Sequence, residues 1–171
     1  MTKTRPLFIA IATATFIALL PSASLARGSE RGSVKATING AHISIDYGRA
    51  ALRGRNMLKQ TQPGQLWRIG ANAPATLESD KDLNFGGTIV PKGKHVLAAR
   101  LVSPGNWTLV FSGGSPGPRK PKVKLAEVPL TLQETSDSTE LVTIQLTDKG
   151  GTGALEIVWG KMHLSTSFKP A

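Results

Sequence analysis

Residues 34–47 read VKATINGAHISIDY, two runs of alternating apolar and polar residues on either side of Asn39-Gly40. Asn-Gly is the dipeptide that best tolerates the positive φ angles of a two-residue type I′ turn, so this stretch predicts a β-hairpin. In its second strand Ile43, Ile45 and Tyr47 share one face, while the residues between them share the other. We expect the first face to lie in the core of the protein.

The same alternation recurs along the rest of the chain. It predicts further strands at residues 75–79, 83–90, 94–102, 107–111, 123–132, 140–147, 154–159 and 161–168. Turns that contain glycine or proline separate these strands, and residues 52–60 alone have the pattern of a helical turn. The sequence therefore predicts one all-β domain over residues 34–168, an antiparallel β-sandwich of jelly-roll-like or flattened-barrel form.

Residues 1–26 have the composition of a cleavable signal peptide. Lys3 and Arg5 form a positive start, residues 6–20 are apolar, and Ser24-Leu25-Ala26 offers the small residues that a signal peptidase recognises. A membrane anchor is the competing interpretation, but the apolar run is shorter than the roughly 20 residues that span a bilayer. We expect residues 27–33 to form a linker and the mature protein to be periplasmic or secreted.

The composition limits the classes of partner. The chain has 171 residues and no cysteine, which excludes disulfides and a lipid-modified cysteine. Its net charge of +10 falls to +8 if Lys3 and Arg5 leave with the signal, an excess that favours anionic neighbours. The short basic run at residues 119–124 lacks interleaved aromatic residues, so we interpret it as a solvated edge strand and expect no nucleic acid.

A second informative stretch is QLWRIGANAPAT, residues 65–76, which places an aromatic ring, a guanidinium and a carboxamide beside small residues. Upstream, DYGR at residues 46–49 and RGR at residues 53–55 add further planar cations. Guanidinium groups pair with carboxylates or phosphates, and a tryptophan ring can stack on a sugar or a guanidinium. We predict a ligand site formed by Tyr47, Arg49, Arg55, Trp67, Arg68 and Asn72.

A structural interpretation of the same residues stays open. Arg68 or Arg55 would pair with Asp46 or Glu78, Trp67 would fill the core, and the carboxamide would satisfy backbone groups of a loop.

Together these motifs resemble the bacterial family called domain of unknown function 2911. The residues on the family pattern are Tyr47, Arg49, Gly54, Arg55, Trp67, Arg68, Gly70, Ala71, Asn72, Ala75, Thr76, Pro91, Gly93, Trp107 and Thr108. Ala50 stands where the family usually has a proline, and the agreement is best over residues 33–111. The resemblance implies an exported all-β domain with no established activity.

Signals for catalysis and for metal binding are weak. Gly113–Gly117 fits the Gly-x-Ser-x-Gly pattern of a hydrolase, but Pro116 lacks the backbone N–H that this elbow uses to hold an oxyanion. His42, His95 and His163 have no spacing typical of metal ligands, and no pair of carboxylates is placed by the sequence at a catalytic separation. We expect no catalytic residues, no metal and no cofactor.

These observations favour an exported, non-catalytic binding module for a small anion, a sugar or another envelope component. Two alternatives remain. One is a hydrolase of envelope material, which requires ionisable groups with shifted pKa values gathered in a cleft. The other is a structural envelope protein that acts through its basic surface.

Overall fold

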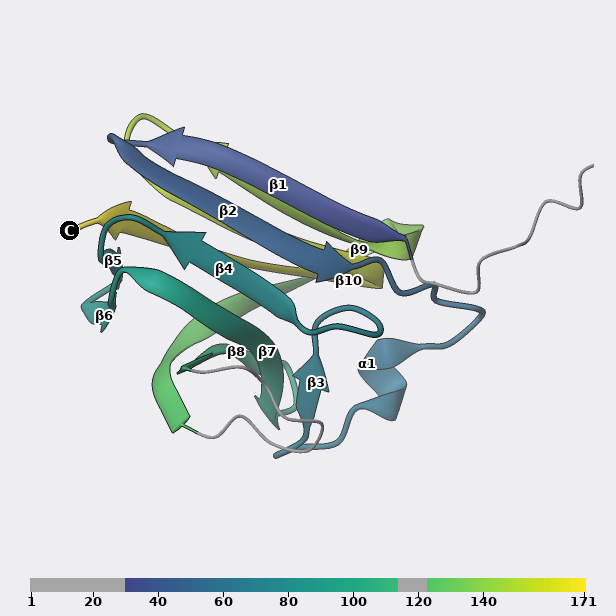
Figure 1. Cartoon of the computed structure of the whole chain (residues 1–171). Coiled ribbons are helices and arrows are strands. Elements are labelled where there is room, and N and C mark those ends of the chain that lie inside the picture. The colour runs from purple at the N-terminus through teal and green to yellow at the C-terminus, as the bar shows by residue number, and fades with distance from the viewer. Residues whose placement is uncertain (1–29, 114–122) are drawn as a thin grey trace, which may run out of the picture.

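The computed structural model describes residues 30–113 and 123–171, and almost all of this backbone is extended (Figure 1). The elements are β1 (Arg31–Ile38), β2 (Ala41–Gly48), α1 (Met57–Gln60), β3 (Leu66–Arg68), β4 (Ala75–Ser79), β5 (Leu83–Phe85), β6 (Thr88–Val90), β7 (Gly93–Ser103), β8 (Asn106–Gly113), β9 (Val123–Asp148) and β10 (Gly153–Pro170). The predicted signal peptide and most of the Gly-x-Ser-x-Gly stretch lie outside the described residues.

The predicted hairpin is present as β1 and β2. Asn39 and Gly40 have φ angles of 44° and 72°, as a type I′ turn requires, and the two strands pair antiparallel. Ile43, Ile45 and Tyr47 are at most 5% exposed, which confirms the predicted core face.

The first strand begins at Arg31, inside the segment expected to be a linker. Gly32 lies on the ring of Tyr47, where an added Cβ would be 2.5 Å from the Tyr47 Cζ atom. The absence of a side chain at Gly32 therefore lets the backbone pack flat on the ring, and the strand extends further than the alternation of residues indicates.

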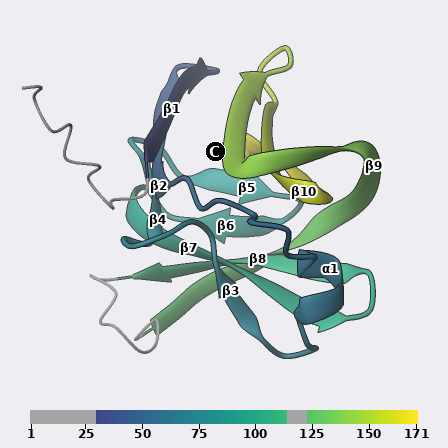
Figure 2. The same ribbon diagram turned by 90° about the vertical axis from the view of Figure 1, so that its right-hand side faces the viewer.

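The strands form one antiparallel sheet that is not closed, in the order β1-β2-β4-β7-β8-β9-β10-β5-β6, with β3 paired to β7. The sheet turns back on itself along β9. Leu130, in its first part, pairs with Trp107 of β8, whereas Leu132 pairs with Leu164 of β10. In Figure 1 β1, β2 and β4 lie in front of β10 and of the second part of β9, and Figure 2 shows β1 and β2 on the opposite side from the hairpin that β9 and β10 form. The all-β antiparallel prediction is confirmed.

Several predicted boundaries differ from the observed ones. The strands predicted at 123–132 and 140–147 are one strand, β9, and those at 154–159 and 161–168 are one strand, β10. Gly160, with a φ of 61°, accommodates an irregularity in the ladder at a place that we expected to be a break. Conversely, the strand predicted at 83–90 is split by Gly86 and Gly87, which turn the chain between β5 and β6.

The core lies between the two layers. Phe85 packs against Phe111 and Phe168 with ring centroids 5.2 and 5.0 Å apart. Trp159 of β10 is 3% exposed and belongs to the same core, and Met57 and Trp67 pack partly buried against that core. The segment of α1 and β3 therefore covers one end of the sandwich, and it carries the residues of greatest functional interest.

Candidate functional site

Two of the motifs meet where the end of β2 touches the loop after β3. An added Cβ at Gly48 would lie 2.0 Å from the carbonyl oxygen of Ala71, and one at Gly70 would lie 2.5 Å from the carbonyl oxygen of Gly48. Gly70 also has a φ of 99°, and the Ala71 N–H donates to the Gly48 carbonyl over 3.2 Å. This contact, which we call the glycine crossing (Gly48, Gly70 and Ala71), sets where β3 leaves the sandwich.

Tyr47 is part of the scaffold. Its side chain is buried, and its hydroxyl accepts a hydrogen bond of 3.0 Å from the backbone N–H of Ile144 in β9. A buried N–H without a partner is costly, so this bond ties β2 to the opposite layer.

Arg49 and Asn72 lie outside the pocket described next. The Arg49 guanidinium pairs with Glu30 at 2.7 Å and reaches the Thr143 hydroxyl at 3.5 Å. Asn72 is exposed, with a φ of 63°, in the loop before β4. Neither residue lines the pocket that holds Arg55, Trp67 and Arg68.

The structure brings Arg55, Trp67 and Arg68 together around a hollow of about 480 Å³, which we call the arginine–tryptophan pocket. The ring of Trp67 stacks on that of Trp159, with centroids 5.4 Å apart and planes inclined by 9°. The Arg55 guanidinium lies over the Trp159 ring, 5.2 Å from its centroid. α1 and β3 supply much of the rest of the wall.

The two arginines of the pocket differ in their partners. Arg55 Nε donates to the carbonyl of Leu52 at 2.9 Å, and Nη2 donates to the carbonyl of Ala51 at 2.7 Å. Arg68 is exposed, and its side chain forms no hydrogen bond or ion pair within the described part of the chain. Neither arginine pairs with Asp46 or Glu78, so the ion pairs of the structural interpretation are not formed.

Sequence reasoning missed Trp159. It comes from β10, far along the chain from Trp67, and we had interpreted it simply as the end of a strand. Its indole Nε1 is buried and has no hydrogen-bond partner among the described residues. The signal available in the sequence was a tryptophan directly before a glycine, but the stacking on Trp67 depends on how β3 and β10 come together.

Comparison with known proteins gives one match. A family model described as a protein of unknown function, DUF2911, matches residues 29–168. The chain belongs to the DUF2911 family. Searches of curated proteins and of solved structures each found no match. The matched region extends well beyond Phe111 and includes β10 up to residue 168, so Trp159 belongs to the DUF2911 domain as much as Trp67 does.

The charge of the pocket in this DUF2911 domain is positive. Arg55 and Arg68 both line it, and none of the described residues that line it is acidic. Because a guanidinium keeps its charge at any ordinary pH, the pocket offers two permanent cations beside an aromatic surface.

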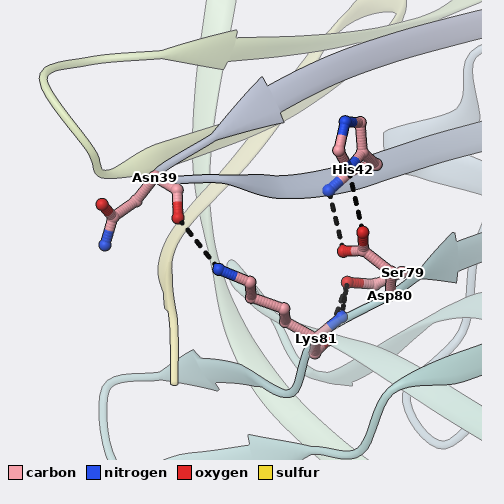
Figure 3. A network of polar contacts seen from close by, with 5 residues as sticks. All are labelled: Asn39, His42, Ser79, Asp80 and Lys81. Carbon is pink, nitrogen blue, oxygen red and sulfur yellow. Dashed lines mark hydrogen bonds and ion pairs between the residues drawn. The ribbon is translucent and has the colours of Figure 1, made fainter.

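A second surface of the DUF2911 domain carries a histidine and an aspartate. Figure 3 shows His42 of β2 beside Asp80, which follows β4. Asp80 accepts hydrogen bonds of 2.8 Å from the backbone N–H of His42 and, at 2.8 Å, from its ring Nδ1. The side chain of His42, and then its backbone N–H, lower the pKa of Asp80. Both residues line a shallow groove of about 570 Å³ on the outer face of β1, β2 and β4.

This groove is a poor place for acid–base chemistry. The side chains of His42 and Asp80 are 76% and 50% exposed, so water screens their interaction. No hydroxyl group in the described part of the chain is hydrogen-bonded to the His42 ring. The pair instead connects the hairpin to β4, as does the contact of the Lys81 ammonium with the Asn39 carbonyl at 3.4 Å in the same figure.

The three histidines lie in separate surroundings. His95 is buried, with Nε2 2.6 Å from the Pro91 carbonyl, and His163 Nε2 lies 3.3 Å from Glu156. Among the described residues there is no group of three His, Cys, Asp or Glu side chains that could hold a metal ion. In that same part of the chain, no helix has the length and apolar character needed to cross a bilayer.

Proposed function

We propose that this DUF2911 domain is a non-catalytic binding module whose arginine–tryptophan pocket holds a small anionic ligand. Among such ligands an acidic sugar matches both the guanidinium groups and the tryptophan rings of the pocket. The observation that carries the proposal is Arg68, an exposed guanidinium without a partner in the described part of the chain, beside two stacked tryptophans and with no acidic residue in the pocket wall.

The chemistry of recognition follows from these groups. A guanidinium donates two parallel hydrogen bonds to a carboxylate, and such charge-assisted bonds are roughly twice as strong as neutral ones. Trp67, which is half-buried and lines the pocket, offers an aromatic surface for the apolar face of a sugar ring. The two carbonyls that hold Arg55 restrict its rotamers before any ligand arrives, which reduces the entropy lost on binding.

The ligand would be met outside the cytoplasm. The charge and apolar pattern of residues 1–26 support export, and envelope polymers that carry uronic acids are anionic. N-terminal sequencing of the protein recovered from a periplasmic extract is expected to begin at Arg27. Recovery from the cytoplasm alone, with Met1 still present, would contradict this part of the proposal.

Calorimetric titration with D-glucuronic acid tests the pocket. Glucose, which lacks the carboxylate, and acetate, which lacks the ring, are the matched probes, and both are expected to bind at least about tenfold more weakly. Arg68→Ala is expected to abolish glucuronate binding, and Arg68→Lys to recover only part of it, because an ammonium cannot form the bidentate contact.

Arg31→Ala serves as the control. Arg31 is exposed on β1 and lies outside the pocket, and its substitution by alanine removes the same charge as Arg68→Ala. The proposal fails if glucuronate does not bind, or if Arg68→Ala and Arg31→Ala weaken binding equally. The second outcome would assign the effect to net charge.

The hydrolase alternative has less support. Among the described residues, the carboxyl groups of Asp80 and Glu127 have a pKa below the ordinary value. Glu127 is partly buried, which by itself raises its pKa, but hydrogen bonds from Lys124 and Thr108 and the charge of Arg100 lower it overall. Both carboxyls thus stay ionised at neutral pH on the outer surface of the sheet, where the structure offers them hydrogen-bond partners but no enclosed cleft.

A further inference from the structure

We infer that the ligand is longer than one sugar unit, and that the arginine–tryptophan pocket is one of two adjoining subsites that bind an acidic sugar linked to a neutral one. This inference rests on the proposed function. Its first support is a second hollow of about 330 Å³, which shares Arg55, Met57 and Trp159 with the arginine–tryptophan pocket. The two hollows therefore lie on either side of the same three residues, and we call the second one the bulge pocket.

The bulge pocket exists because the ladder between β9 and β10 is interrupted. Thr139 pairs with Gly160 and Glu134 pairs with Met162, so residues 135–138 of β9 face Lys161 alone. Thr135 turns its hydroxyl to the Asp137 carbonyl, at 2.8 Å, within this extra segment. Bulges of this kind redirect side chains and are frequent beside binding sites. Here the bulge leaves a hollow in the place of a flat sheet.

The side chains of the bulge pocket suit a neutral, hydroxyl-rich group. Lys161 and Glu134 are both exposed, and neither forms an ion pair or a side-chain hydrogen bond in the described part of the chain. An ammonium donates to hydroxyl oxygens and a carboxylate accepts from hydroxyl groups, so together they can hold one sugar unit. A second carboxylate placed beside Glu134 would be repelled by it, whereas the described lining of the arginine–tryptophan pocket holds no acidic residue.

Arg55 connects the two subsites. Its Nε and Nη2 atoms are used by backbone carbonyls, whereas Nη1 has no hydrogen-bond partner among the described residues. Because Arg55 lines both hollows, this remaining nitrogen can donate to a ligand near the link between the two units. A ligand that fills both subsites should therefore bind more tightly than the acidic unit alone.

Calorimetric titration of the purified protein with three related probes tests the inference. The probes are D-glucuronic acid, cellobiouronic acid (glucuronic acid linked β-1,4 to glucose) and the β-1,4-linked dimer of glucuronic acid. Cellobiouronic acid is expected to bind at least about tenfold more tightly than glucuronic acid and more tightly than the dimer of two acids. Glu134→Gln is expected to reduce the difference between the two disaccharides.

Lys161→Ala is expected to weaken cellobiouronic acid binding by roughly tenfold and to leave glucuronic acid binding unchanged. Lys169→Ala is the matched control, because Lys169 is also exposed on β10 but does not line either hollow. Equal effects of the two lysine variants would overturn the second subsite.

The two proposals fail in different ways. If glucuronic acid and cellobiouronic acid bind equally well, and Arg68→Ala abolishes both, the binding module stands and the second subsite is wrong. If none of the three probes binds, the proposed function itself is wrong, and the inference that rests on it is wrong with it.

Discussion

The glycine crossing and the arginine–tryptophan pocket share the segment of residues 65–71, yet the polar groups of the crossing are hydrogen-bonded whereas a guanidinium of the pocket is not. At the crossing, Gly48 and Gly70 pack so closely that neither has room for a side chain, and the Ala71 N–H is hydrogen-bonded. In the pocket, two residues before Gly70, Arg68 is exposed and has no partner in the described part of the chain.

One sequence motif therefore contributes both to the scaffold and to the pocket. The buried residues hold β3 in place against the end of β2, and the exposed ones present chemistry to solvent. Stability and ligand binding should therefore respond to different substitutions within a few residues of each other.

The largest effect on stability is expected for Gly48→Ala. The added Cβ would lie 2.0 Å from the Ala71 carbonyl oxygen, a backbone atom that cannot rotate away. We expect the free energy of unfolding in urea to fall by about 3 kcal/mol or more. Gly113→Ala is the control, because its Cβ would meet the end of the flexible Leu125 side chain at 3.3 Å. If both variants are equally stable, the crossing is not a structural constraint.

A smaller effect is expected for Tyr47→Phe. The change leaves the buried Ile144 N–H without its acceptor while preserving the ring. We expect a loss of roughly 1–2 kcal/mol in the free energy of unfolding, with the glucuronate affinity unchanged. Weaker ligand binding with unaltered stability would instead assign Tyr47 to the pocket and break the distinction between the two regions.

Arg68→Ala is expected to change the free energy of unfolding by less than about 0.5 kcal/mol, because the side chain is exposed and has no partner in the described part of the chain. Urea denaturation followed by tryptophan fluorescence measures this directly. A substantial loss in the free energy of unfolding would show that Arg68 stabilises the fold, as the residues of the glycine crossing do.

The smallest effect should come from the exposed His42–Asp80 pair, which lies outside both regions. The folded-state pKa of Asp80 is below its ordinary value of 3.8. Its contribution to stability is therefore present above the ordinary pKa and is lost as the pH falls through the lowered one. Asp80→Asn should melt slightly below the unsubstituted protein at about pH 6 and together with it at about pH 2. If the difference between the two melting temperatures grew as the pH fell, the prediction that ionised Asp80 stabilises the fold would be wrong.

Part of the site could be predicted from the sequence. Residue type and nearness in the chain indicate Arg55, Trp67 and Arg68 as site residues, and the structure places all three around one pocket. The same pattern indicates Tyr47 and Arg49, but Tyr47 bonds to Ile144 and Arg49 pairs with Glu30. A pattern of residue types cannot distinguish a residue that lines the pocket from one that bonds within the scaffold. The difference depends on which residues of other strands lie against each side chain.

The β-hairpin at residues 34–47, the extended character of nearly every segment and the family follow from the amino-acid sequence, because turn angles and strand alternation are properties of neighbouring residues. The stacking of Trp159 on Trp67, the pairing of β9 with both β8 and β10, and the contact of Gly48 with Ala71 follow from the three-dimensional arrangement of the strands. Each of these contacts joins residues far apart along the chain. They depend on how the strands register and cross, which no local pattern specifies.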